Sequence, residues 1–412
     1  LRNGRKNAAL NRRLRVTLPH PKWLRGTTQF VKPSLHKMTQ TRYGFIGCGM
    51  MGQEHLRNIA LLNHAAVTRI YEPDEGMAQL SLKLAPHAQR CASADEVILA
   101  NDVDCLVITS PNFCHAAQIK HIASLRQIPV LLEKPACTSI EQVRELQSLT
   151  QQFSQSIWVA MEYRYMPPIM RLVQEVHSQH NTGAVNLISI REHRFPFLTK
   201  VGDWNRFNQY TGGTLVEKCC HFFDLMRLLT RSEPTRIYAS ASIAHNHLEE
   251  RYADGTPDIL DNAYVIVDFE SGQRAMLELC MFAEGARYQE EISVVGPKAK
   301  VECFVPGPGR FWPAHLGEPP TPMLVLSPRF PKGPQELEVP VDAALLNAGD
   351  HNGSTFYQHQ KFQNFVNHQG PIEVSLQDGL AAVRMGLAAQ ESARTGQAID
   401  LTRGEYALTG LR

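Results

Sequence analysis

A glycine-rich turn near residue 47 constrains the fold more than any other feature of the chain. The sequence GCGMMG follows the apolar run YGFIG and precedes QEHLRNIALL, whose apolar residues recur at helical spacing. In a strand–turn–helix context, Gly47 allows the tight turn, Gly49 lets the backbone approach a pyrophosphate, and Gly52 lets the helix pack against the strand. The first turn of that helix would face the negative charge. The motif therefore predicts a parallel α/β domain that binds a dinucleotide.

Two kinds of strand pattern follow one another along the chain. Between residues 43 and 160, short apolar runs alternate with helical stretches, as in βαβ units. From residue 185 onward, longer runs such as NLISIREHRF and DNAYVIVDFESG alternate apolar and polar residues, which is typical of an antiparallel sheet with one covered face. Helices predicted over residues 216–229 and 376–395 would cover that face. The fold class expected is an α/β Rossmann N-terminal domain plus an α+β C-terminal domain with a large, mostly antiparallel, open sheet.

The first 41 residues differ from the rest in charge. They contain ten Lys or Arg residues and no Asp or Glu, so the remainder carries 32 basic against 40 acidic residues. This basic segment lacks aromatic interleaving and an amphipathic period, and Met38 introduces the glycine-turn region, so a nucleic-acid or membrane role is disfavoured. We expect a disordered basic extension over 1–41, a dinucleotide-binding domain over 42–160, and a substrate-binding and oligomerisation domain over 161–412.

The hydropathy of the chain and its cysteines indicate the class of protein and the cell compartment. No segment approaches the roughly 18 consecutive apolar residues that span a bilayer. The nine cysteines are odd in number and scattered without a CxxC pair, so neither a disulfide framework nor a zinc ribbon is indicated. We expect a cytoplasmic protein without a metal site.

Glu72 indicates which dinucleotide the domain prefers. It ends the second apolar strand, twenty residues after Gly52. An acidic side chain at this place accepts hydrogen bonds from the adenosine ribose hydroxyls and repels a 2′-phosphate. The sequence therefore predicts NAD in preference to NADP, with Cys48, Met50 and Met51 completing the contacts of the turn.

Lys134 is the first candidate for chemistry. It follows the apolar run PVLLE at the carboxyl edge of the parallel sheet, where such sheets place their ligands. A lysine there can hydrogen-bond a substrate oxygen and stabilise alkoxide character as a hydride leaves the neighbouring carbon.

Six segments resemble those of the glucose-fructose oxidoreductase, inositol dehydrogenase and rhizopine-catabolism (Gfo/Idh/MocA) family. They span roughly residues 43–402, in the family's order. The segments are GCGMMG, TSPNFCHAAQIKHIA, LLEKPACTSIEQVREL, GGTLVEKCCHFFDLMRLL, DNAYVIVDFESGQ and VSLQDGLAAVRMGLAAQESARTGQAIDL. Together they are specific for the fold and much less specific for a substrate.

The resemblance implies further site residues. Cofactor contacts are expected around the nicotinamide, with the floor of the cleft beneath it, and substrate contacts are expected where the chain enters the second domain. The implied cofactor residues are Ser110, Pro111, Asn112, His115, Glu133, Lys134 and Glu162, and the implied substrate residues are Tyr163, Arg164, Trp204 and Arg206. For Arg164 an ion pair at the domain hinge, and for His115 and Trp204 core packing, remain open alternatives.

The family's second-domain helix carries Gly-Gly, an Asp, and a His four residues later. Here the run reads Gly212, Gly213, Glu217 and His221, with Glu in place of Asp. An i, i+4 spacing puts Glu217 and His221 on one helical face, so the carboxylate could orient the imidazole while His221 takes a hydroxyl proton. The longer arm of Glu217 leaves open that it contacts substrate instead. Cys219 and Cys220 are not expected to join His221 at a metal, because adjacent residues point in different directions.

These features favour an NAD-dependent oxidoreductase that oxidises a secondary hydroxyl of a sugar, sugar derivative or cyclitol to a ketone by hydride transfer. Two alternatives remain: a glycosidase or lyase that uses NAD for a transient oxidation, and a dinucleotide-sensing regulator without turnover. The intact pair of Lys134 and His221 argues against the regulator. A homodimer or homotetramer through the open sheet is expected, with no nucleic-acid partner.

Overall fold

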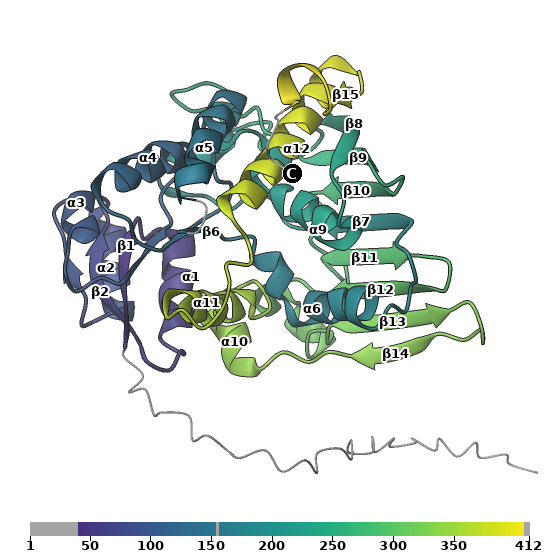
Figure 1. The fold of residues 1–412 in the computed structure, drawn as a ribbon, viewed down its shortest axis with the longest axis horizontal. Coiled ribbons are helices and arrows are strands. Elements are labelled where there is room, and N and C mark those ends of the chain that lie inside the picture. The colour runs from purple at the N-terminus through teal and green to yellow at the C-terminus, as the bar shows by residue number, and fades with distance from the viewer. Residues whose placement is uncertain (1–39, 154–155, 408–412) are drawn as a thin grey trace, which may run out of the picture. The chain divides into compact units, whose positions relative to one another are not determined.

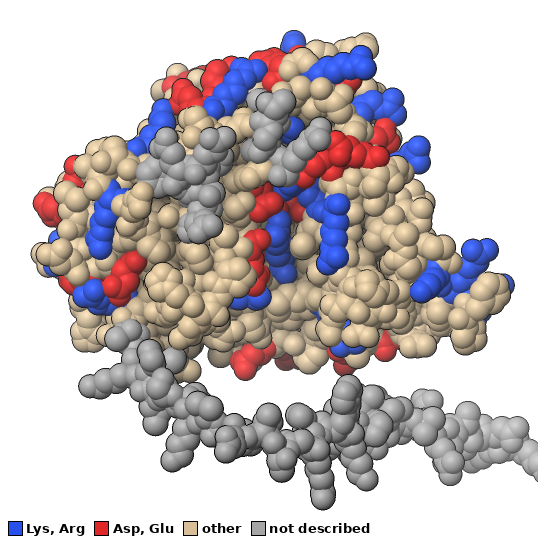
Figure 2. Space-filling view, viewed as in Figure 1, with Lys and Arg blue, Asp and Glu red and all other residues tan. Residues whose placement is uncertain are grey.

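The structure, a computed structural model, describes residues 40–153 and 156–407 (Figure 1). Most of the predicted basic extension, residues 1–39, therefore lies outside the described residues. On the face shown in Figure 2, blue and red side chains are interspersed across the described part of the chain. No helix within the described residues is long and apolar enough to cross a membrane.

The first sheet has six strands in the order β3-β2-β1-β4-β5-β6, all parallel. The order reverses between β1 and β4, so helices leave these two neighbouring strands in opposite directions and a crevice opens at their carboxyl ends. Its strands are β1 (Thr41–Ile46), β2 (Ala65–Tyr71), β3 (Gln89–Arg90), β4 (Cys105–Ile108), β5 (Val130–Leu132) and β6 (Ile157–Val159). Its helices are α1 (Met50–Ile59), α2 (Glu75–Leu84), α3 (Ala94–Ile98), α4 (His115–Leu125) and α5 (Ile140–Phe153).

The second sheet has nine strands in the order β14-β13-β12-β11-β7-β10-β9-β8-β15, several of which lie side by side in Figure 1. Among the described strands of this second sheet, only β7 and β10 pair in parallel, and the other pairs are antiparallel. The predicted fold class is thus confirmed. The strands are β7 (Leu187–His193), β8 (Pro234–Ser242), β9 (Asn262–Phe269), β10 (Arg274–Cys280), β11 (Glu290–Val295), β12 (Ala299–Val305), β13 (Met323–Pro328), β14 (Gln335–Glu338) and β15 (Ile399–Asp400).

Helices cover one face of this sheet. Along β7 and β9, buried residues alternate with more exposed ones. Helix α12 (Leu376–Thr395) packs against β8 and against α9 (Cys220–Thr230), and α6 (Pro167–Val173) packs against β12 and β13. Helix α12 has the bounds expected from the sequence and begins with a capping box between Ser375 and Asp378. Two further helices, α10 (Ala343–Ala348) and α11 (Ser354–Val366), pack against α1 of the first sheet.

The helix predicted over residues 216–229 is divided in two. Helix α8 (Thr214–Glu217) ends at Glu217, and α9 begins at Cys220. At the junction the amide of Cys219 bonds to the carbonyl of Thr214, five residues back, instead of four. Glu217 and His221 therefore lie on different helical segments. A short helix, α7 (Asn208–Thr211), precedes the pair.

Candidate functional site

A cleft of about 620 Å³ lies at the carboxyl ends of the first sheet. Both halves of the chain contribute to it, because the segment from Thr199 to Trp204 lines the same cleft as the glycine turn. Ten of the expected cofactor residues line it: Gly47, Gly49, Met50, Met51, Glu72, Ser110, Pro111, Asn112, Glu133 and Lys134. Four others, Cys48, Gly52, His115 and Glu162, do not line the cleft.

The glycine turn packs closely against the neighbouring strand and leaves the start of α1 open. Gly47 has a φ of +83°, and a Cβ there would lie 2.6 Å from the amide nitrogen of Ser110. A Cβ at Gly52 would lie 2.7 Å from Thr109 Oγ1, so this glycine brings α1 close to β4. No described atom lies within 4 Å of the Cβ position at Gly49, and no side chain caps the first turn of α1. The backbone N–H groups at the start of α1 are therefore available to a phosphate.

Glu72 is held at the edge of this turn. Its carboxylate accepts hydrogen bonds from the backbone N–H of Cys48, at 2.5 Å, and of Asp74, at 2.9 Å. These two bonds leave lone pairs on both oxygens for ribose hydroxyls. The Cys48 side chain itself is fully buried, and burial raises the pKa of its thiol, which is the condition of a packing residue rather than a reactive one.

His115 supports the cleft from behind. Its ring nitrogens contact the carbonyl oxygens of Pro135, at 2.7 Å, and Ser110, at 3.0 Å. Burial lowers the pKa of this histidine, in spite of these two contacts. His115 thus joins the loop after β4 to the loop after β5, and it positions cleft residues without facing the cleft.

Lys134 connects the cleft to the second half of the chain. Its ammonium group donates a hydrogen bond to the backbone carbonyl oxygen of Glu217, at 3.1 Å. Burial opposes the charge, but Cys220, Glu133 and Glu217 together raise the pKa of Lys134, so the side chain is a cation. Behind it, Glu133 accepts from His55 at 2.9 Å, and His55 contacts His359 at 2.7 Å.

His221 lies against Tyr163. The two rings stack with centroids 4.2 Å apart and planes 9° apart, and both residues are almost fully buried. Burial, together with the positive charges of Lys134 and Lys218, holds the pKa of His221 well below its usual value. The imidazole is therefore neutral at neutral pH and can accept a proton.

The expected bond between Glu217 and His221 is absent from the described residues. Glu217 Oε1 accepts from the Lys200 ammonium at 3.0 Å, and His221 Nδ1 has no hydrogen-bond partner. The turn between α8 and α9 separates the two side chains, while the facing loop supplies a nearby cation. Lys200 also lies 4.4 Å above the Trp204 ring and lines the cleft. Sequence reasoning missed Lys200 because the segment around it has no periodic pattern or motif.

Two expected substrate contacts have internal partners instead. Arg164 donates to both oxygens of Asp224 and to the carbonyl of Glu373, which is the hinge ion pair that the sequence left open. Arg206 is almost fully buried and donates to Glu250 at 2.9 Å. Neither arginine lines the cleft. Trp204 does line it, with its ring edge-to-face against Phe113 at 6.0 Å.

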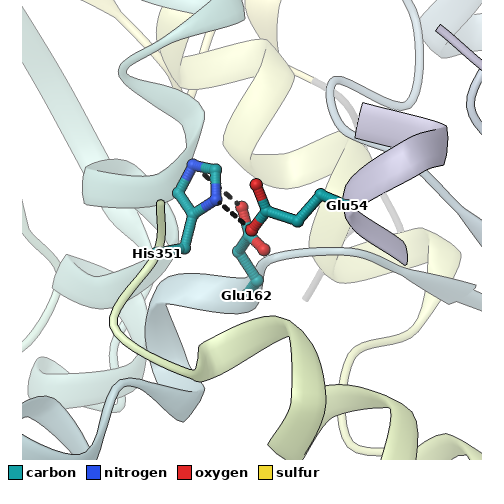
Figure 3. Close-up of side chains that lie close together, drawn as sticks. All are labelled: Glu54, Glu162 and His351. Carbon is teal, nitrogen blue, oxygen red and sulfur yellow. Dashed lines mark hydrogen bonds and ion pairs between the residues drawn. The ribbon is translucent and has the colours of Figure 1, made fainter. Parts of the chain in front are cut away.

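Another titratable cluster lies beside Tyr163 and was also missed. Glu54, Glu162 and His351 meet there from three distant segments of the chain (Figure 3). The ring of His351 lies 6.2 Å from that of Tyr163, centroid to centroid. Glu162 was expected among the cofactor contacts, and the structure places it in this cluster. No sequence motif marks Glu54 or His351, because only the tertiary fold brings them together.

Comparisons with known proteins agree with this architecture. Residues 41–161 match the family model described as "Oxidoreductase family, NAD-binding Rossmann fold". Residues 178–401 match "Oxidoreductase family, C-terminal alpha/beta domain". Together the two matches contain all six sequence segments on which the family resemblance rests, and they confirm it.

Individual relatives are distant in sequence. The rhizopine catabolism protein MocA of Rhizobium meliloti is 25% identical over 243 residues, which are 59% of this chain and 72% of that protein. An inositol 2-dehydrogenase of Arthrobacter sp. is 28% identical over 251 residues, 60% of this chain and 69% of that one. A myo-inositol dehydrogenase structure from Corynebacterium glutamicum superposes with a TM-score of 0.69 at 20% identity, over 89% of this chain and 100% of that chain.

Proposed function

The chain belongs to the Gfo/Idh/MocA oxidoreductase family, and from that premise we propose that it is an NAD-dependent dehydrogenase of sugars or cyclitols. The reaction proposed is oxidation of a secondary hydroxyl to a ketone, with release of NADH and a proton. The inositol 2-dehydrogenases among its relatives support this class of substrate.

One observation carries the proposal. Lys134 lines the dinucleotide cleft, and its ammonium group bonds to the last residue of α8, one turn before His221. The cation of Lys134 thus lies in the cleft and acts electrostatically on the neutral imidazole of His221, which does not itself line the cleft. A regulator that only senses the dinucleotide has no need of such a pair.

The residues divide the chemistry between them. Bound NAD supplies the hydride acceptor. Lys134 would donate a hydrogen bond to the substrate hydroxyl oxygen and stabilise its alkoxide character. His221, neutral before the reaction, would take the hydroxyl proton as the carbon–oxygen double bond forms.

The neighbouring side chains would set coenzyme and substrate preference. Glu72, already fixed by two backbone N–H groups, would accept from the ribose hydroxyls of NAD and disfavour the 2′-phosphate of NADP. Trp204 and Lys200, which line the cleft, and Glu217, which pairs with Lys200, would contact the sugar or cyclitol ring. Tyr163 would hold His221 in place through its stacked ring.

The proposal extends to assembly and location. Tyr238, Tyr264, Ile266 and Leu187 are exposed on the face of the second sheet that the helices leave open. An apolar sheet face of this kind suits a second copy of the chain, as a homodimer or within a homotetramer. All nine cysteines are free, which suits the reducing cytoplasm.

A substrate panel tests the activity. Cyclitols, aldoses and sugar acids are each incubated with the protein and NAD, and NADH is followed by its absorbance, while any coenzyme that co-purifies is identified. The expected result is stoichiometric NADH with at least one cyclitol or sugar. Tightly retained NAD, bond cleavage and no net NADH would replace the proposal with a lyase or glycosidase that oxidises its substrate transiently.

A further inference from the structure

The cluster of Glu54, Glu162 and His351 joins three parts of the fold (Figure 3). Glu54 belongs to α1, the helix that begins at the glycine turn. Glu162 begins the 3₁₀ turn η2 (Glu162–Tyr165), just after β6, and His351 lies in the loop between α10 and α11. Both carboxylates are almost fully buried, whereas the side chain of His351 retains 23% of its exposure.

The two ring nitrogens of His351 face different carboxylates. Nδ1 lies 2.8 Å from Glu54 Oε1, and Nε2 lies 3.6 Å from Glu162 Oε1. A neutral imidazole has a single N–H, so only the imidazolium can donate toward both carboxylates. A metal ion would require one nitrogen to point its lone pair at an ion shared by both carboxylates. This geometry therefore suits a proton at each nitrogen better than a metal.

Other groups around the cluster complete its hydrogen bonds. Thr355 Oγ1 lies 3.0 Å from Glu54 Oε1 and 2.7 Å from Glu162 Oε2, and the backbone N–H of Asp350 donates to Glu54 Oε2 at 3.3 Å. The loop approaches so closely that a Cβ at Gly349 would overlap the Glu54 carboxylate. Further charged groups that act on the cluster are His55, Glu133, Lys134, Lys218 and Arg310.

We propose that His351 is a positioning residue for the reacting centre: as an imidazolium it ties the coenzyme helix, through Glu54, to Glu162 and hence to Tyr163. The proposal rests on the function given above, because Tyr163 is the ring on which His221 stacks. A charged tie at this place fixes the distance between the coenzyme helix and the proton acceptor. It also adds a positive charge near His221.

The charge balance of the cluster supports this assignment. Burial disfavours a charged imidazole, but the carboxylates of Glu162 and Glu54 raise the pKa of His351 to about 9. Burial also opposes the charge of Glu54, yet His351 lowers the pKa of that carboxyl. The same imidazolium is one of the charges that lower the pKa of His221, after burial, Lys134 and Lys218.

The protonation state can be measured without turnover. In the full chain with isotope-labelled histidine, the nitrogen shifts assigned to His351 by comparison with His351→Gln should show two protonated nitrogens at about pH 7.5, with a midpoint near 9. A neutral ring at that pH would overturn the proposal. So would stoichiometric binding of Zn²⁺ that is lost in both His351→Gln and Glu162→Gln. Neither the nitrogen shifts nor the Zn²⁺ titration requires a substrate. Both can therefore refute this proposal independently of the proposed dehydrogenase activity.

The positioning role is tested in the active enzyme. His351→Gln should lower kcat by about tenfold or more, since misplaced reacting groups are costly. The acidic limb of its kcat/KM profile should move to higher pH, because a charge that depresses the pKa of His221 is removed. His193→Gln is the matched control: His193 has similar exposure and pairs with Glu278 on the second sheet. Unchanged kcat and pH profile in His351→Gln, or an equal loss in His193→Gln, would contradict the role.

Chemical rescue of His351→Ala tests the same role without introducing a Gln side chain. In His351→Ala, added imidazole can reach the partly exposed position that the ring vacated. Rescue of kcat should be strong at about pH 6 and weak at about pH 8.5, following the imidazolium fraction. Equal rescue at both pH values would show that a neutral ring suffices, and a folded variant with reduced kcat that imidazole never rescues would equally contradict the proposal.

Discussion

The ammonium group of Lys134 donates a hydrogen bond to the backbone carbonyl oxygen of Glu217, at 3.1 Å. This bond runs from the carboxyl edge of the first sheet to the end of α8, the segment that leads into His221. The Lys134 side chain is therefore fixed to the backbone four residues before His221. Predictions about either of them follow from this link.

Removing either group should slow chemistry far more than it weakens coenzyme binding. Lys134→Ala and His221→Ala should each lower kcat by at least about 100-fold, as for a lost acid/base or oxyanion contact. The affinity for NAD should change much less, because the glycine turn and Glu72 are left intact. Steady-state kinetics and NAD titration by fluorescence measure the two effects. Lys120→Ala, which removes an exposed ion pair with Glu145, should leave both unchanged.

Glu217 should act on substrate binding, because its carboxylate pairs with Lys200 and not with His221. Glu217→Gln and Lys200→Met should each raise KM for the sugar or cyclitol by roughly tenfold. In the double variant the loss of binding free energy should be smaller than the sum of the two single losses, because the two residues form one ion pair. The acidic limb of the pH profile should stay in place. A shift of that limb in Glu217→Gln would restore the dyad that the sequence suggested.

Glu72 should govern the choice of coenzyme. Glu72→Ala should weaken NAD binding and reduce the difference in affinity between NAD and NADP. The reason is that the Glu72 carboxylate both accepts hydrogen bonds from the ribose hydroxyls and repels the 2′-phosphate. Calorimetric titration measures the affinities of the unsubstituted chain and of Glu72→Ala for NAD and for NADP. NADP binding as tight as NAD binding in the unsubstituted chain would rule out this role for Glu72.

His351 should make stability depend on pH in the alkaline range. Its pKa in the folded chain, about 9, is above the ordinary value of 6.5, so its contribution is full below about pH 6.5 and is lost as the pH rises through 9. The shift corresponds to roughly 3 kcal/mol. Urea denaturation across this range should show the free energy of unfolding falling more steeply in the unsubstituted chain than in His351→Gln. Parallel curves for the two proteins would contradict the prediction.

Local patterns in the sequence predicted much of the fold. The glycine turn predicted a strand, a sharp turn and a helix, and Gly47 and Gly52 have the turn and the close packing expected of them. Helix α12 was also predictable, because a cap residue, an apolar period and a terminal glycine all occur within one segment. In both cases the determining interactions join residues close in the chain.

The partners of the site's charged side chains could not be predicted in the same way. Arg164 pairs with Asp224, Lys200 with Glu217, and His351 with Glu54, and each pair joins residues separated by many others. The i, i+4 spacing suggested that Glu217 and His221 lie on one helical face. The break between α8 and α9 instead places them on two separate helical segments. Such contacts form only in the tertiary fold, and no local pattern in a single sequence indicates them.

The central claim is hydride transfer from a substrate carbon to NAD in the cleft that Lys134 lines, with His221 as the proton acceptor. It is tested most directly with a sugar or cyclitol from the panel that carries deuterium at the carbon bearing the reacting hydroxyl. We predict one deuterium in each NADH released, one ketone formed per NADH, and NADH formation at least about 100-fold slower with Lys134→Ala. Deuterium that returns to the product while free NADH stays at zero, or full activity in Lys134→Ala, would contradict it.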